Sequence, residues 1–260
     1  MSAAINSLEG DVAIVTGGRR GIGRAIALSF SEAGAAVCIG DVVTQDGKLD
    51  GVAKEIQKLG RRSLALGVDI THKIEVDDMV RKVVGEFGKI DILVNCAGMW
   101  IPGQTLVECD ENNWDSVINT NLKGTYFCCQ AVAGEMVKQR RGSIVNIASE
   151  LGIYPLPGIG AYGVAKAGII LLTQQLALEL GNSKIRVNAI APGMVKTDMN
   201  IEIRSSPEVE REIASKIVLG RLGEPNDISK TALFLACDSS DLITGQTIVA
   251  NGGGIIPALF

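Results

Sequence analysis

In the stretch TGGRRGIG, residues 16–23, three of the four glycines have a G-x-x-x-G-x-G spacing: Gly17, Gly21 and Gly23. It follows the apolar run VAIVT (12–16) and opens the helical pattern GRAIALSFSEAG. A strand that turns through glycines into a helix presents free backbone N–H groups, which can bind a pyrophosphate. The stretch therefore favours a βαβ unit that binds a dinucleotide. Ile22 would pack beneath the nucleotide, whereas Arg20 either reaches a phosphate or is simply solvated.

An acidic residue beyond this stretch bears on which dinucleotide binds. Asp41 ends the second candidate strand, 18 residues after Gly23. An acid about 20 residues beyond the glycines binds the hydroxyls of the adenosine ribose in such units. A carboxylate there repels a 2′-phosphate, and neither Val42 nor Val43 supplies a compensating cation. The sequence therefore predicts NAD in preference to NADP.

Short β-branched runs alternate with longer helical patterns along the whole chain. The candidate strands are 12–16, 36–41, 63–69, 91–95, 143–149, 185–192 and 247–250. Several are apolar on both faces, as a parallel sheet covered by helices requires. The repeated order of strand and helix predicts one doubly wound α/β domain over residues 1–260. The segment 198–220 interrupts this order and is expected to form a lid over the substrate.

Composition excludes several classes of function. The formal net charge is −4, so no attraction to nucleic acid or to an anionic membrane is indicated. The N-terminus lacks the features of a signal peptide, and no run of 18 apolar residues suggests a membrane span. The six cysteines show no C-x-x-C spacing and are typical of reduced thiols in a cytoplasmic protein. The single histidine, His72, cannot support a Ser-His-Asp triad or a zinc site.

Tyr162 and Lys166 lie four residues apart in GAYGVAKAG (160–168), so they share one face of a helix. A neighbouring ammonium stabilises a phenolate and lowers the pKa of the tyrosine toward a value useful for a base. Ser149 ends the fifth candidate strand, at the edge where open parallel sheets bind ligands. The alternative is a pair of surface side chains that merely reach solvent.

Together the motifs TGGRRGIG, NCAG (95–98), YGVAK (162–166) and PGMVKT (192–197), with Ser149, resemble the short-chain dehydrogenase/reductase family in its compact single-domain branch. The resemblance runs from about Leu8 to Gly254. It implies a Rossmann-like, mostly parallel seven-stranded sheet with helices on both faces, a nicotinamide cofactor, and hydride transfer between an alcohol and a carbonyl. Three departures, Cys96, Glu150 and Asn251, remove no catalytic group. Glu150 and the tail IIPALF (255–260) are expected to shape the substrate pocket.

The resemblance also assigns roles to individual residues. Tyr162 is the acid/base, Lys166 its modulator and a ligand of the nicotinamide ribose, Ser149 the partner of the substrate oxygen, and Asn121 the fourth member. Asn121 would hold a water linked to the lysine. The residues expected to contact the cofactor are Gly17, Arg20, Ile22, Gly23, Asp41, Asp69, Ile70, Asn95, Ala97, Gly98, Tyr162, Lys166, Pro192, Gly193, Val195 and Thr197. The expected substrate pocket comprises Met99, Trp100, Glu150, Tyr154, Leu156, Met194 and Met199, with no metal.

Asn121 lies in a mostly apolar stretch between residues 111 and 139, which the sequence predicts to be helical. An asparagine there should cap or kink the helix, or bind water. Asn119 is the competing candidate for the catalytic role.

The chain is therefore interpreted as an NAD-dependent dehydrogenase or ketone reductase acting on a small secondary alcohol or ketone. The alternatives are a sugar dehydrogenase, because Glu150 could accept bonds from sugar hydroxyls, and an NAD-binding regulator without turnover. Enoyl reductases of related sequence separate the tyrosine and lysine by six or more residues, so the spacing of four argues against that reaction. The span 111–139 and the helix 161–180 carry apolar residues on several faces, which predicts a homo-oligomer, most simply a homotetramer.

Overall fold

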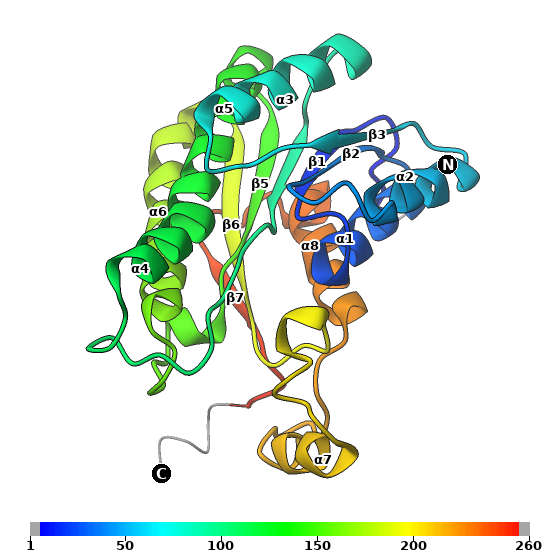
Figure 1. Ribbon diagram of the computed structural model, residues 1–260. Coiled ribbons are helices and arrows are strands. Elements are labelled where there is room, and N and C mark those ends of the chain that lie inside the picture. Colours follow the sequence, from blue (N-terminus) through cyan, green and yellow to red (C-terminus); the bar gives the residue numbers. More distant parts are fainter. Residues whose placement is uncertain (1–5, 255–260) are drawn as a thin grey trace.

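The computed structural model describes residues 6–254, whose strands form one sheet with helices on both faces (Figure 1). The strand order is β3-β2-β1-β4-β5-β6-β7, and every neighbouring pair is parallel. Successive strands are therefore added first on one side of β1 and then, from β4 onward, on the other side. Open α/β sheets bind ligands at such a point, here between β1 and β4. The strands are β1 Val12–Thr16, β2 Ala36–Asp41, β3 Ser63–Gly67, β4 Ile92–Asn95, β5 Gly142–Ile147, β6 Ile185–Pro192 and β7 Thr247–Ala250.

Helices α1, α2 and α8 lie on one face of the sheet, and α3, α5 and α6 on the other, while α7 stands apart below the carboxyl ends of the strands (Figure 1). The helices are α1 Gly21–Glu32, α2 Lys48–Lys58, α3 Lys73–Phe87, α4 Glu111–Ile118, α5 Gly124–Gln139, α6 Ala161–Leu180, α7 Pro207–Ser215 and α8 Pro225–Ala236. Short 3₁₀ turns span Glu150–Gly152, Gly181–Ser183, Asp198–Asn200 and Asp238–Ser240.

The central strands are buried on both faces, which explains their continuous apolar runs. All five residues of β1 are buried, and alternate side chains enter different cores. Val15 belongs to the core beneath α1 and α8, whereas Ile14 belongs to the core beneath α3 and α5. Burying a branched aliphatic side chain contributes about 1.5–3 kcal/mol. These two cores hold the strand ends, and the loops that follow them, in fixed positions.

Four of the predicted strand ranges match the structure residue for residue, and the other three differ by one or two residues at their ends. Helix α8 was not predicted. Its start nevertheless carries helix signals, because Pro225 occupies the first turn and Glu224 and Asp227 form reciprocal capping bonds.

The span 111–139 is not one helix. A π-helical turn, Asn119–Lys123, separates α4 from α5, so the expected distortion at Asn121 is confirmed. Single π turns inside helices occur frequently at functional sites. Asn121 is fully buried in this turn, whereas Asn119 is partly exposed.

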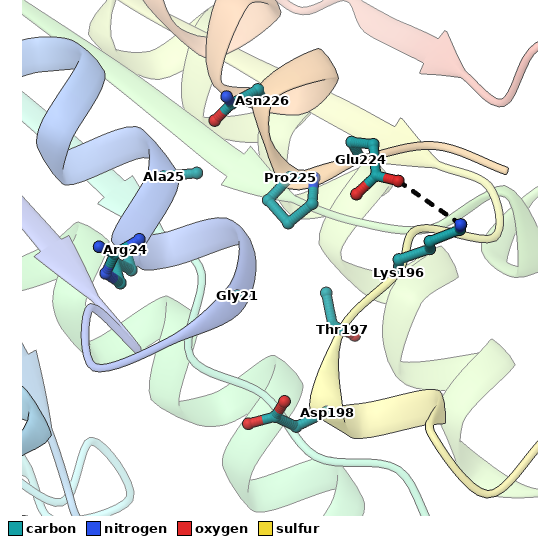
Figure 2. A pocket seen from close by; sticks show the side chains of 9 residues that line it. All are labelled: Gly21, Arg24, Ala25, Lys196, Thr197, Asp198, Glu224, Pro225 and Asn226. Carbon is teal, nitrogen blue, oxygen red and sulfur yellow. Dashed lines mark ion pairs between the residues drawn. The ribbon is translucent and has the colours of Figure 1, made fainter. Parts of the chain in front are cut away.

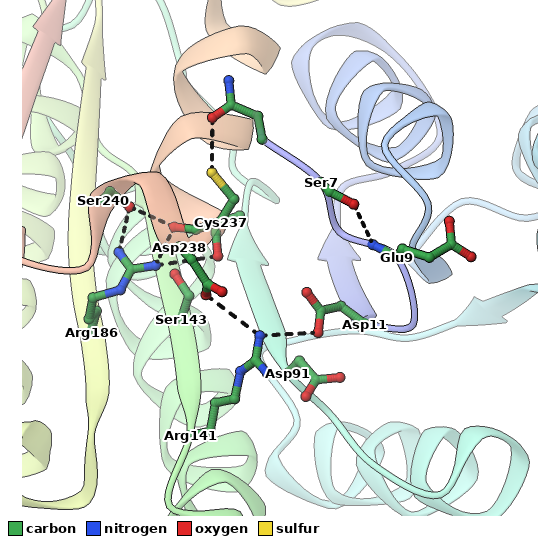
Figure 3. A network of polar contacts seen from close by, with 12 residues as sticks. Ser7, Glu9, Asp11, Asp91, Arg141, Ser143, Arg186, Cys237, Asp238 and Ser240 are labelled. Carbon is green, nitrogen blue, oxygen red and sulfur yellow. Dashed lines mark hydrogen bonds and ion pairs between the residues drawn. The ribbon is translucent and has the colours of Figure 1, made fainter. Parts of the chain in front are cut away.

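A network of charged side chains joins the amino ends of the strands (Figure 3). The Asp91 carboxylate accepts a hydrogen bond from the Val12 N–H at 2.8 Å and pairs with Lys89 at 2.8 Å. Arg186 donates to the Leu235 carbonyl and to Ser240, which ties β6 to the end of α8. A cleft of about 410 Å³ lies at this edge. These contacts join elements of the fold at the amino ends of the strands, opposite the carboxyl edge where the functional site is expected.

Helix α6 is the one helix within residues 6–254 that could span a membrane by length and composition alone. Only 33% of its most apolar stretch is buried, and the buried residues include Lys166, Ile169 and Thr173, which face the rest of the protein. Its outer face leaves Leu171 and Leu178 at 66% and 79% exposure. This apolar face is therefore available to a partner.

Candidate active site

Ser149 lies just beyond the carboxyl end of β5 and caps the short turn Glu150–Gly152. Its Oγ accepts a hydrogen bond from the Leu151 N–H at 3.2 Å, and the side chain is buried. Gly152 brings this turn against α6, because a Cβ built there would lie 2.6 Å from the Lys166 carbonyl carbon. The sequence thus places the serine directly beside the first turns of α6.

Tyr162 and Lys166 project from those first turns on the same side, as their spacing predicts. The Lys166 Nζ lies 5.5 Å from the centroid of the tyrosine ring and donates a 2.7 Å hydrogen bond to the Ile147 carbonyl. Lys166 is only 4% exposed. Buried ammonium groups are rare unless paired or functional. The alternative of two surface side chains reaching solvent is therefore wrong.

The pKa values of this pair differ from the sequence-based expectation. Desolvation raises the pKa of Tyr162 to about 12, and a hydrogen bond with Ser149 opposes this rise. Burial lowers the pKa of Lys166 to about 8. The sequence predicts that Lys166 lowers the tyrosine pKa, whereas desolvation raises it in this structure. The pKa of the phenol is therefore above its ordinary value and the pKa of the amine below it, and shifted pKa values of this kind are common at active sites.

Asn121 directs its amide into the same region. Its Nδ2 donates to the carbonyls of Met99 and Val117 at 2.8 and 2.9 Å. Its Oδ1 is buried and has no hydrogen-bond partner within residues 6–254. A Cβ built on Gly98 would lie 2.7 Å from this oxygen and 3.7 Å from the Lys166 Nζ. Only a glycine leaves the space between amide and ammonium open to a small polar molecule.

The glycine stretch forms a tight turn from β1 into α1. Gly17 has φ +67°, and a Cβ there would lie 2.8 Å from the Ala97 Cα. A Cβ on Gly23 would approach the Gly17 carbonyl oxygen to 2.2 Å. Thr16, which the sequence analysis did not single out, accepts hydrogen bonds from the N–H groups of Cys96 and Ala97 at 3.1 and 3.2 Å. The loops after β1 and β4 are thereby locked together around the start of α1.

Two of the residues expected to contact the cofactor, Asn95 and Ile70, have buried side chains that contact other parts of the protein. The Asn95 Nδ2 donates to the Asn146 Oδ1 at 2.8 Å, which places the side chain between strands. Ile70 is 5% exposed, and its side chain fills the space beside Gly124. Asp69 is half-exposed, and its carboxylate accepts from the N–H and hydroxyl of Thr71. The remaining cofactor predictions lie along the same edge: Ala97 and Gly98 after β4, Pro192 at the end of β6, and Gly193, Val195 and Thr197 after it.

The acid at the end of β2 has a partner that the sequence analysis missed. Arg19 Nε lies 3.5 Å from the Asp41 Oδ1, and the same guanidinium pairs with Asp46. Neither Val42 nor Val43 supplies a cation, but Arg19 of the glycine stretch does. The sequence signal for this contact is the doubled arginine of TGGRRGIG.

A cleft of about 440 Å³ opens beside the glycine stretch, between the start of α1, the segment after β6 and the start of α8 (Figure 2). It contains none of the four candidate catalytic residues. On its rim Arg20 pairs with Asp198 at 2.9 Å, so the arginine is neither free nor simply solvated. This contact joins the glycine stretch to the beginning of the segment 198–220.

The residues present fit a dinucleotide. The glycines at 17 and 23 leave no room for side chains, the α1 N-terminus directs N–H groups toward the carboxyl edge, and the buried Arg19 Nε has no hydrogen-bond partner within residues 6–254. These groups would bind the pyrophosphate and the adenosine ribose. Residues 6–254 gather no cluster of three metal-ligating side chains.

Comparisons with known proteins agree with this geometry. A family model described as enoyl-(acyl carrier protein) reductase matches residues 17–254. The chain is 43% identical over 250 residues to a 3-oxoacyl-(acyl-carrier-protein) reductase of Thermotoga maritima, covering 96% of this chain and 99% of the relative. It is 44% identical over 249 residues to a hydroxy(phenyl)methylsuccinyl-CoA dehydrogenase subunit of Thauera aromatica, covering 95% and 97%.

Solved structures give the same result. A putative short-chain alcohol dehydrogenase of Sinorhizobium meliloti superposes with a TM-score of 0.91 at 36% identity, covering 97% of this chain and 99% of that chain. This chain belongs to the short-chain dehydrogenase/reductase family. It is therefore an oxidoreductase that uses a nicotinamide cofactor and acts on CH–OH or keto groups.

As in the family pattern, this short-chain dehydrogenase/reductase brings its serine, tyrosine and lysine together at the carboxyl edge. The predicted substrate residues surround that edge unevenly. The Trp100 ring lies 6.4 Å from the Tyr162 ring, and the Glu150 carboxylate accepts a 2.8 Å hydrogen bond from Asn251. Burial raises the pKa of Glu150. Met194 contacts Asn200, whereas Leu156 and Met199 are about half exposed, at 48% and 47%.

The pocket predictions include one segment that the structure does not describe. The sequence IIPALF was expected to help shape the pocket, but its residues 255–260 lie outside the described residues. Met99 accepts a hydrogen bond from Thr120 through its sulfur, beside the π-helical turn, and Tyr154 follows the Ser149 turn.

Proposed function

We propose that this protein transfers a hydride reversibly between a secondary alcohol and NAD⁺, with Tyr162 as the acid/base. The observation that carries the proposal is the buried Lys166 beside Tyr162 and Ser149, at the edge that also holds the glycine turn. A non-catalytic NAD-binding protein on the same fold has no need for a buried ammonium and an unpartnered buried amide oxygen. Both groups cost free energy to desolvate.

Each residue has a role in alcohol oxidation. Ser149 donates a hydrogen bond to the substrate oxygen and holds it beside the phenol, a positioning role. Tyr162 accepts the hydroxyl proton as the carbonyl forms. Lys166 stabilises the phenolate and binds the nicotinamide ribose, and Asn121 holds a water that links the lysine to solvent. The nicotinamide ring, when bound, accepts the hydride. In the reverse direction Tyr162 returns the proton to the carbonyl oxygen.

NAD is proposed as the preferred cofactor because Asp41 ends β2 with a carboxylate that would face the adenosine ribose. The side chain is partly buried, with 13% exposure, so solvent screens its charge poorly. Arg19 lies beside it but is shared with Asp46, so the guanidinium balances only one of the two carboxylates. We expect kcat/KM for NAD⁺ to exceed that for NADP⁺, and Asp41→Ala to reduce the ratio by about tenfold, the effect of one lost charge contact. Equal kcat/KM values in the unaltered protein would contradict the preference.

The substrate is proposed to be a small, uncharged secondary alcohol or ketone. The two relatives are named for acyl groups on a carrier protein or coenzyme A, so the assay panel should contain 3-oxoacyl thioesters beside simple alcohols and ketones. A sugar dehydrogenase is the second candidate. One support is the Glu150 carboxylate, which accepts a 2.8 Å hydrogen bond from the Asn251 amide and could also accept from sugar hydroxyls. The other is a solved structure named as a putative gluconate dehydrogenase, which superposes with a TM-score of 0.91 at 33% identity.

The enoyl reductase description of the family model points to a different reaction. Reduction of a carbon–carbon double bond does not need the tetrad geometry of alcohol oxidation, and Tyr162 and Lys166 keep the spacing of four. Including an enoyl thioester in the same panel tests this alternative directly.

The segment 198–220 is proposed to act as a lid in a single catalytic domain. Asp198 pairs with Arg20 of the glycine turn, and Arg204 donates to the Thr197 carbonyl at 3.0 Å. The lid would therefore be anchored to the residues expected around the nicotinamide. We also propose a cytoplasmic location, in keeping with six free thiols.

A homo-oligomer, most simply a homotetramer, is expected because α6 leaves Val164, Leu171 and Leu178 exposed along its outer side. Exposed apolar patches of this kind usually mark interfaces. Sedimentation equilibrium at micromolar concentration should give a mass about four times that of the chain, and Leu171→Glu with Leu178→Glu should shift it to smaller species. A monomer in the unaltered protein would be inconsistent with this proposal.

A further inference from the structure

The guanidinium of Arg19 is buried between two carboxylates at the end of β2. Its Nε lies 3.5 Å from the Asp41 Oδ1, and its NH1 donates to the Asp46 Oδ2. Arg19 is 8% exposed, whereas the Asp46 side chain is 32% exposed. The arginine comes from the glycine turn and Asp46 from the loop before α2. The three side chains therefore connect the two segments expected to flank the adenosine ribose.

This cluster has an unused donor. The Arg19 Nε makes no hydrogen bond within residues 6–254, although its atom is buried. A buried donor without an acceptor costs free energy, so the unpaired Nε points to a ligand that accepts a hydrogen bond from it. The Asp41 Oδ1 beside it already accepts from the Val43 N–H at 3.0 Å. A ribose hydroxyl or a phosphate oxygen supplies the missing acceptor.

We propose that Arg19 and Asp46 together determine how strictly this chain distinguishes NAD from NADP, an inference that rests on the proposed NAD site. One guanidinium between two carboxylates leaves a net charge of about −1, which opposes a 2′-phosphate. Asp46 holds the guanidinium in this arrangement. Without the Asp46 charge, Arg19 would balance Asp41 alone and could bind the 2′-phosphate through a charge-assisted bond.

Asp46 also has a structural role, which the substitution must preserve. Its Oδ1 accepts from the Lys48 N–H at 3.0 Å at the start of α2. Asparagine retains an oxygen for that bond and removes only the charge, so Asp46→Asn separates the two roles. Asp50, an exposed acid in the first turn of α2, offers a matched control because Asp50→Asn removes the same charge nearby.

The test is fluorescence titration of NADH and NADPH against the unaltered protein, Asp46→Asn, Arg19→Gln and Asp50→Asn. The ratio of the Kd for NADPH to the Kd for NADH should fall about tenfold in Asp46→Asn, mainly through tighter NADPH binding, which is the scale of one charge contact. It should rise in Arg19→Gln, where both carboxylates lose their cation. Asp50→Asn should leave the ratio unchanged.

The outcomes separate the two proposals. A tighter Kd for NADPH than for NADH in the unaltered protein would overturn the proposed NAD preference. If the unaltered protein prefers NADH, an unchanged ratio in Asp46→Asn, or an equal change in Asp50→Asn, would overturn the role of Arg19 and Asp46. Thermal unfolding of each variant shows whether a parallel change in both Kd values results from a loss of stability. Only a change in the ratio of the Kd for NADPH to the Kd for NADH supports the proposal.

Discussion

Tyr162→Phe is expected to lower kcat by about 10²–10⁴-fold, the usual contribution of a general acid–base group. Phenylalanine keeps the ring and its packing against Trp100, whose ring lies 6.4 Å away, but carries no transferable proton. The Kd for NADH should change little, because phenylalanine keeps the aromatic ring at this cofactor position and the charged contact to the ribose is assigned to Lys166. Steady-state oxidation of the best alcohol, with NADH titrated separately, measures both quantities.

Tyr126→Phe is the matched control for this substitution. Tyr126 lies on α5 with 40% exposure, and its hydroxyl accepts a hydrogen bond from Gln130 on the surface. This variant should retain full activity. Near-normal turnover by Tyr162→Phe would show that the phenol is not the proton path, and the mechanism would have to be abandoned.

Lys166→Met is expected to reduce both turnover and nucleotide binding. Methionine matches the length of the buried stem but supplies no donor to the ribose, and a hydrogen bond to a charged group contributes about 1.5–3 kcal/mol, roughly 10–100-fold in Kd. The loss of the ammonium also destabilises the phenolate, so kcat should fall by at least about tenfold, in addition to the loss of NADH binding. Both kcat and the Kd for NADH are measured.

The same variant tests the structural role of the lysine. The Ile147 carbonyl loses its 2.7 Å donor, which alone lowers the free energy of unfolding by about 1–3 kcal/mol, whereas removal of the desolvated ammonium offsets part of this loss. Lys138→Met, on the 71%-exposed side chain of α5, is the control and should change neither quantity. Unaltered NADH binding in a folded Lys166→Met protein would contradict the assigned ribose contact.

Local patterns predict most of the fold because parallel strands must be apolar on both faces. The runs 12–16, 36–41, 185–192 and 247–250 have the predicted ends, although Arg186 and Asn188 interrupt the apolar pattern of the third. Helix α8 follows an irregular segment and was not predicted, although its sequence carries two signals. Its buried residues Ile228, Ala232 and Leu235 are spaced i, i+4 and i+7, and its start carries Pro225 and the two capping acids.

The Tyr162–Lys166 pair was predicted from its spacing, since i and i+4 on a helix lie together, whereas the roles of Ser149 and Asn121 came from the family resemblance. The spacing could not reveal that Lys166 is buried and donates to the Ile147 carbonyl. Nor could it reveal that desolvation raises the pKa of Tyr162. Likewise, the position of Arg19 beside Asp41 depends on how two loops meet across the sheet. Contacts between segments distant in sequence are invisible to motif spacing.

The most direct test of the central claim follows the hydrogen itself. A secondary alcohol deuterated at its carbinol carbon is oxidised by the unaltered protein with NAD⁺, and the reduced nucleotide is analysed by mass spectrometry. Direct hydride transfer predicts one deuterium in each NADH formed, with the Tyr162→Phe protein forming the same product far more slowly. Reduced nucleotide without deuterium would contradict the account. So would the lack of turnover in both directions, with no NADH formed from any alcohol or sugar of the panel and no NADH consumed with any ketone or thioester.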